Sequence, residues 1–281
     1  MSIQERCMIV SLNVCMWTAR KFDKSASKQT TATYGASDSA ARVNKLLIPK
    51  DALSGVTKAG NALRAEYMKM TLPWSDNNQR LLSGDLYLKF TERMRELIRT
   101  FDNAAEDLCK EYAILVADAE VQLNGLYNAD DYPDQGTIRD KFSTDILYSP
   151  VPASGHMMVD IGNEETAKLK EKIDNAVNSS LERAQGDAWQ RLFDVVQHMA
   201  TRLDDTEAVF RDTLVGNIRS LVDLLPGLNV TGDAKLAQLQ KDVEDKLLVY
   251  TPKELRKDDF ARADTATAAK DIMAKMAAYM G

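Results

Sequence analysis

A basic stretch in the first 50 residues carries the side chains best suited to contact with another molecule. Its segment 17–24 (WTARKFDK) mixes cations with aromatic residues. Cations neutralise phosphates and aromatic rings stack on bases, so this mixture is typical of single-stranded nucleic-acid binding. The candidate residues for binding a nucleic acid or an acidic partner are Trp17, Arg20, Lys21, Lys24, Lys28, Arg42 and Lys45. In the alternative interpretation, Trp17 belongs to the core and the lysines form a solvated surface.

The charge of the sequence is unevenly distributed. The formal net charge is −6, yet residues 1–100 hold 16 Lys and Arg against 9 Asp and Glu, and residues 101–281 hold 20 against 33. A basic part beside an acidic body can mark a nucleic-acid surface. It can equally mark self-association, in which the basic part of one copy meets the acidic part of the next, or simply two solvated faces.

The sequence lacks the motifs of the common enzyme classes. It has no phosphate-binding glycine loop and no Gly-x-Ser-x-Gly nucleophile motif. Two histidines and three unclustered cysteines do not form a recognisable metal or disulfide framework. Asp130, Asp131 and Asp134 could offer oxygens to a hard cation, but the segment lacks the glycine and the distal glutamate of a calcium loop. We therefore expect no enzyme, no metal site and no cofactor.

Two long helices are the clearest structural prediction. Between residues 85 and 127, apolar side chains recur at steps of three and four from Phe90 to Leu126, which is close to the coiled-coil period. A second stripe from Leu169 to Leu203 predicts a helix over 164–203. Since the segment between the helices returns the chain to the same end, we expect them to pack as an antiparallel pair.

The other expected elements are shorter. Patterns of β-branched and apolar residues predict three strands of one small antiparallel sheet, at about 7–16, 142–148 and 156–161. Residues 20–41 are basic and then small and polar, which predicts a mobile or weakly helical segment. Short helices are expected at 40–48, ended by Pro49, and at 51–71.

These elements predict a mainly α (α+β) fold: an elongated bundle with two long antiparallel helices and a small antiparallel β-sheet. We expect one family-length protein in three consecutive parts. Residues 1–84 form a basic part with a strand and short helices, and residues 85–205 form the long helical pair with an inserted β-hairpin. Residues 206–281 form the C-terminal helices.

Several segments resemble an uncharacterised, domain-of-unknown-function family of tailed phages. The segments that carry the resemblance are 17–24 (WTARKFDK), 44–47 (NKLL), 71–74 (TLPW), 126–133 (LYNADDYP), 148–152 (YSPVP), 189–192 (WQRL) and 276–281 (MAAYMG). The family has no established activity, so the resemblance assigns a role to no residue. Its genes often lie near those of MoxR-type AAA+ ATPases and von Willebrand factor A-type proteins, which implies an adaptor or substrate role beside such an ATPase.

The expected function is therefore that of a non-enzymatic phage interaction or assembly protein that is oligomeric and could act as an adaptor to a MoxR-type ATPase system. The alternative is a single-stranded nucleic-acid binding or annealing protein that uses the basic N-terminal third. The sequence has no run of 18 apolar residues and no signal-peptide layout at its start. We expect no membrane partner and place the protein in the cytoplasm of the infected bacterial host.

Overall fold

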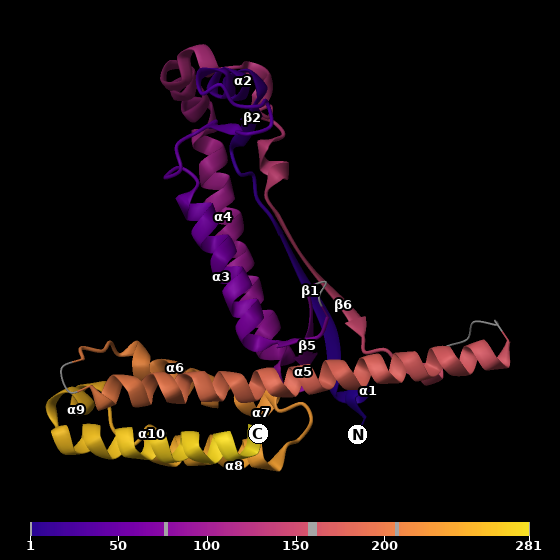
Figure 1. The fold of residues 1–281 in the computed structure, drawn as a ribbon, viewed down its shortest axis with the longest axis vertical. Helices are drawn as coiled ribbons and strands as arrows, with labels where there is room; N and C mark the ends of the chain where they lie inside the picture. The colour runs from indigo at the N-terminus through magenta and orange to yellow at the C-terminus, as the bar shows by residue number, and fades with distance from the viewer. Residues whose placement is uncertain (1, 76–77, 157–161, 206–207, 281) are drawn as a thin grey trace. The chain divides into compact units, whose positions relative to one another are not determined.

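Helices dominate the computed structural model of this chain, and they accompany a small antiparallel sheet (Figure 1). The structure describes residues 2–75, 78–156, 162–205 and 208–280. The expectation of a mainly helical α+β protein is therefore confirmed. Among the described residues, no helix combines the length and the apolar character needed to span a membrane.

The chain divides into two compact units, and each is built from separate stretches of sequence. We call Met1–Ser11, Met68–Phe90 and Leu147–Gly281 the terminal unit, because it holds both ends of the chain. Leu12–Tyr67 and Thr91–Ile146 form the second unit, which we call the ribbon unit. This division cuts across the three consecutive parts expected from the sequence.

The four-stranded sheet has the strand order β4-β5-β1-β6. Its strands are β1 (Cys7–Cys15), β4 (Leu72–Pro73), β5 (Gln79–Ser83) and β6 (Ser143–Pro150). β1 runs antiparallel to β5, from Cys7 opposite Ser83 to Ser11 opposite Gln79. The strands expected at 7–16 and 142–148 are confirmed. Of the third, at 156–161, only His156 is described, within a 3₁₀ turn, and residues 157–161 lie outside the described part of the chain.

Helices of the terminal unit pack against α5 and against one another. Those that contact one another are α5 (Asn163–Asp204), α6 (Thr213–Val222), α7 (Leu225–Leu228), α8 (Ala234–Leu247), α9 (Pro252–Lys257) and α10 (Asp259–Met280), and of these α6, α8 and α10 contact α5. The predicted stripe of α5 is buried from Val177 to Leu203, with Leu181 and Val195 half-buried. Asp233 caps α8 and also accepts hydrogen bonds from Gln185 and Trp189 on α5.

The longest helix of the ribbon unit is α4 (Gly84–Leu123), which begins in the terminal unit. Its predicted stripe is buried at every position from Phe90 to Tyr112. α3 (Ser54–Met70) lies beside it (Figure 1). The two approach closely at Gly60, where a Cβ atom would lie 3.5 Å from the Phe101 ring and 2.7 Å from the Met16 sulfur. The antiparallel pairing of the two long helices stays a prediction.

The basic segment after β1 is more ordered in secondary structure than its composition indicates. It forms β2 (Arg20–Asp23), α2 (Lys24–Thr33) and β3 (Val43–Leu46). β2 and β3 pair as a separate two-stranded antiparallel ribbon. The short helix expected at 40–48 is therefore wrong, because pairing with a distant strand outweighs the local preference of these residues.

The buried stripe of α4 leads to a test of the helix phase. Leu108 is buried, whereas Lys110 is exposed and pairs with Asp107. We expect Leu108→Asp to lower the free energy of unfolding by about 3 kcal/mol or more, since it buries an unpaired charge. Lys110→Asp should cost less than about 1 kcal/mol. Urea unfolding of both variants measures the difference, and equal losses would show that the helix phase is wrong.

Candidate functional site

The β2–β3 ribbon has two faces of different chemistry. Cross-strand partners in an antiparallel pair point to the same side, and successive residues alternate. The register pairs Arg20 with Leu46, Lys21 with Lys45, Phe22 with Asn44 and Asp23 with Val43. We call the face with Lys21, Asp23 and Lys45 the inner face. The outer face carries Arg20, Phe22 and Leu46.

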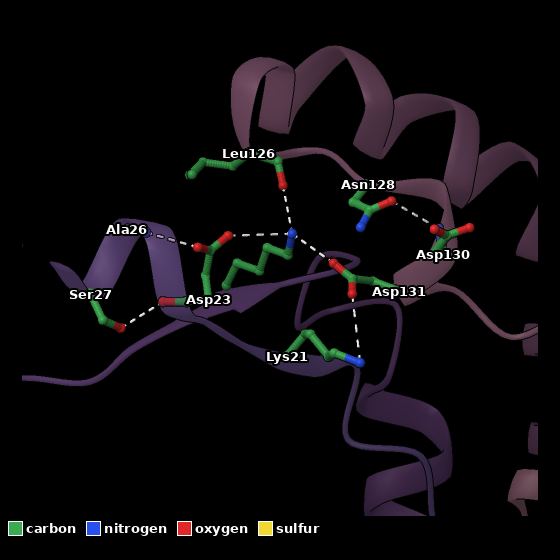
Figure 2. A network of polar contacts seen from close by, with 9 residues as sticks. Lys21, Asp23, Ala26, Ser27, Leu126, Asn128, Asp130 and Asp131 are labelled. Atoms are coloured by element: carbon green, nitrogen blue, oxygen red, sulfur yellow. Dashed lines mark hydrogen bonds and ion pairs between the residues drawn. The ribbon is translucent and has the colours of Figure 1, made fainter. Parts of the chain in front are cut away.

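The inner face is organised by the buried ammonium group of Lys45. Figure 2 labels the residues that contact it, which are Asp23, Leu126 and Asp131. The Lys45 Nζ lies 2.6 Å from a carboxylate oxygen of Asp131 and 3.5 Å from one of Asp23, and it donates to the carbonyl oxygen of Leu126 at 2.7 Å. Burial acts to lower the pKa of Lys45, but Asp131 and then Asp23 outweigh it and raise that pKa above its usual value. An ammonium group donates three hydrogen bonds, so these three acceptors can satisfy it completely.

Asp23 connects this network to α2. Its carboxylate accepts a hydrogen bond from the backbone N–H of Ala26 at 2.8 Å, which caps the helix. That bond, followed by the bond from Lys45, lowers the pKa of Asp23, although burial opposes the shift. The Ser27 hydroxyl donates to the carbonyl oxygen of Asp23, and the backbone N–H of Val43 donates to the Ser27 hydroxyl oxygen. The inner network thereby holds both strands and the helix between them.

Asp131 pairs with both lysines of the inner face. It lies in the short 3₁₀ turn Ala129–Asp131, which follows α4, and Lys21 approaches it at 3.6 Å. Within the described ranges, no three His, Cys, Asp or Glu side chains are grouped to hold a metal ion. The next residue, Tyr132, donates its hydroxyl hydrogen to the carbonyl oxygen of Leu47 at 2.8 Å, and burial raises its pKa to about 12.

The outer face of the ribbon combines an aromatic ring with cations. Phe22 is 40% exposed, and the guanidinium of Arg42 lies 4.5 Å from its ring centroid. Arg20 is exposed two residues along the same strand. We find no ion pair for Arg20 or Arg42 among the described residues. This surface therefore presents positive charge next to a flat apolar group.

A cavity of about 750 Å³ adjoins this face, within the ribbon unit, and shares Arg20 and Leu46 with it. Its apolar lining residues are Val14, Met16, Trp17, Leu46, Ile48 and Leu53. Every ionisable side chain in the lining is a cation: Arg20, Lys50, Lys58 and Arg64. Arg64 also donates to the carbonyl oxygen of Val14 at 3.0 Å. Such a volume falls in the range of small-ligand sites.

Trp17 is held at the cavity by Tyr112 of α4. Its ring lies 5.8 Å from that of Tyr112, with the two planes at 74°. Tyr112 is buried and donates its hydroxyl hydrogen to the carbonyl oxygen of Pro133 at 2.7 Å. The position of Trp17 is thereby fixed from one side while the ring still lines the cavity, so the ring is oriented in advance of any ligand.

The structure thus separates the residues that the sequence singled out. Trp17, Arg20 and Arg42 lie on or beside the outer face, whereas Lys21 and Lys45 belong to the inner network. Lys24 and Lys28 are exposed on α2. The sequence reasoning missed Lys50, Lys58 and Arg64. Lys58 and Arg64 could have been found from their position in the expected helix 51–71, on the side away from its apolar stripe.

The inner network predicts unequal effects for its two lysines. We expect Lys45→Met to lower the free energy of unfolding by about 3 kcal/mol, because it leaves Asp23 and Asp131 without their buried counter-charge. Lys21→Met should cost less than about 1 kcal/mol, because the Lys21 side chain is 54% exposed. Adding Asp131→Asn to Lys45→Met should recover part of the loss. Urea denaturation measures all three, and equal losses for the two single variants would contradict the network.

The pKa shifts predict how the stability of this network depends on pH. The pKa of Asp23 is lowered, so its contribution is present above its ordinary value near 3.8 and is lost as the pH falls through the lower folded value. The pKa of Lys45 is raised, so its contribution is present below 10.5 and is lost at more alkaline pH.

We therefore expect Asp23→Asn, which keeps a good helix cap, to be less stable than the wild type at pH 7. The difference should shrink below pH 4, as the wild-type carboxylate becomes protonated. Chemical unfolding at pH 7 and pH 3 measures the two differences. A difference that stays constant over this range would show that the charge of Asp23 does not stabilise the fold.

Comparison with known proteins gives this site no precedent. No protein-family model matches the chain, and neither the curated proteins nor the solved structures include a match. The resemblance to the tailed-phage family therefore stays an expectation. A function for the chain therefore has to be inferred from the geometry and charge of the structure itself.

Proposed function

We propose that this protein is a non-enzymatic binding protein that holds single-stranded nucleic acid on the outer face of the β2–β3 ribbon. The observation that carries the proposal is the segregation of charge across the ribbon. Asp23 and Asp131 face the ammonium group of Lys45 on the inner side, while Arg20 and Arg42 flank the exposed ring of Phe22. The outer face is thus free of the carboxylates that would repel phosphates.

A single strand suits this surface better than other anionic partners. Its phosphates need cations spaced along a path, and its unstacked bases need flat apolar groups or guanidinium planes. Phe22 and Arg42 supply such groups side by side, and Arg20 supplies a further cation. The overall charge of −6 does not argue against binding, because association depends on the local potential more than on the net charge.

Self-association is a second candidate, and one specific observation favours it. Ile114 and Val121 are exposed and lie two turns apart on α4, so they share one face of the helix. A second copy that covered this face could extend a coiled coil in an oligomeric assembly protein. Under this proposal, the partners implied by the phage resemblance are a MoxR-type AAA+ ATPase and a von Willebrand factor A-type protein in the host cytoplasm.

The salt dependence of binding tests the primary proposal. We expect Arg20→Gln/Arg42→Gln to flatten the plot of log affinity against log salt by about 1.4, or about 0.7 for each phosphate that is no longer neutralised. Phe22→Ala should weaken binding by about 1 kcal/mol or more, with an unchanged slope. Fluorescence anisotropy of a labelled oligothymidylate between about 50 and about 300 mM salt measures both.

The matched control is Lys110→Gln, an exposed lysine of the same unit that lies on α4. It should leave affinity and slope unchanged. If the wild-type protein fails to bind the strand, the primary proposal is wrong. If the double variant instead lowers the mass measured by light scattering in buffer without DNA, the cations contact another copy of the chain, and the assembly function replaces the primary one.

A further inference from the structure

We infer that the cavity beside the ribbon receives an unstacked base of the bound strand. The flanking phosphates then contact its cationic rim, which consists of Arg20, Lys50, Lys58 and Arg64. This inference rests on the proposed function and adds to it a defined nucleotide-binding pocket. The ribbon face and the cavity share Arg20 and Leu46, so a strand that crosses Phe22 continues directly to the cavity mouth. The ligand is thus a segment of the same strand.

The lining of the cavity has the two chemical parts that a nucleotide requires. The wall formed by Trp17, Ile48 and Leu53 offers a planar ring and aliphatic groups to the faces of a base. The hydroxyl groups of Thr18, Ser54 and Thr57 can form hydrogen bonds with its polar edge. Trp17 is already held by Tyr112, so little side-chain entropy is lost when a base stacks on it.

The charges of the rim indicate a ligand with several anionic groups. Lys50, Lys58 and Arg64 line the cavity together with Arg20, and the lining contains no carboxylate. A ligand with a single acidic group, such as a fatty acid, would use only one of these positions. Successive phosphates of a strand could occupy several of them at once, which matches the distribution of positive charge.

The position of the base can be observed directly by fluorine NMR. In protein labelled with 5-fluorotryptophan, Trp17, Trp74 and Trp189 each give one resonance, and single Trp→Phe variants assign them. We expect a short oligothymidylate to shift the Trp17 resonance. The signals of Trp74 and Trp189, which belong to the terminal unit, report whether other sites respond. The variants serve only to assign the signals, and the titration with the strand is made on the wild-type sequence of the whole chain.

A pair of variants measures the contribution to affinity. Trp17→Leu should weaken strand binding about tenfold while leaving the salt slope unchanged, because it removes stacking and no phosphate contact. Tyr34→Ala is the matched control, since Tyr34 is an aromatic residue of the same unit that is 81% exposed and lies outside the cavity lining. It should bind as the wild type does.

The outcomes separate this inference from the proposed function. If the strand binds and depends on Arg20 and Arg42, but the Trp17 resonance does not move, the cavity inference is wrong and the ribbon function stands. If thymidine monophosphate shifts the Trp17 resonance as strongly as the strand at equal nucleotide concentration, the cavity is a free-nucleotide site and the strand assignment is overturned. If no strand binds the wild type, both proposals fail.

Discussion

The ammonium group of Lys45 is the group on which the position of the β2–β3 ribbon depends. Among the eight residues of the two strands, Lys45 alone is buried, so the ribbon lacks an apolar core of its own. An isolated two-stranded pair is only marginally stable in water. Contacts of Lys45 with Asp131 and the Leu126 carbonyl oxygen therefore replace apolar burial as the link between the ribbon and the segment after α4, and its contact with Asp23 joins the two strands.

The same interaction determines the chemistry of the opposite face. Because side chains alternate along a strand, turning Asp23 and Lys45 inward turns Phe22 and Leu46 outward. The carboxylates are thereby neutralised on one side, and the cations Arg20 and Arg42 remain available on the other. A buried ion pair of this kind contributes little net stability, but it specifies one register, because a shift by one residue would reverse the two faces. The binding that we propose depends on that register.

The regular parts of the fold could be predicted because their signals are local. The steps of three and four along α4 repeat over many turns, and the structure buries the stripe from Phe90 to Tyr112 as expected. The ribbon could not be predicted in this way. Leu46 and Leu47 suit a short helix as well as a strand, and the deciding contact joins Lys45 to Asp131, far away in the sequence. For the same reason, the sequence alone placed Lys45 among the cations expected to face solvent or a partner. The cavity rim could not be predicted either, because it combines residues of the ribbon and of α3 that belong to no single motif.

The outer ribbon face and the adjoining cavity form one binding surface in the function that we propose. Hydrogen–deuterium exchange of the whole chain, with and without a saturating single-stranded oligonucleotide, tests this most directly. We expect slower exchange in peptides that cover residues 14–23 and 42–58, which include the ribbon strands and most of the cavity lining. Unchanged exchange in these peptides, or protection confined to the helices α6 to α10 of the terminal unit, would contradict a shared binding surface.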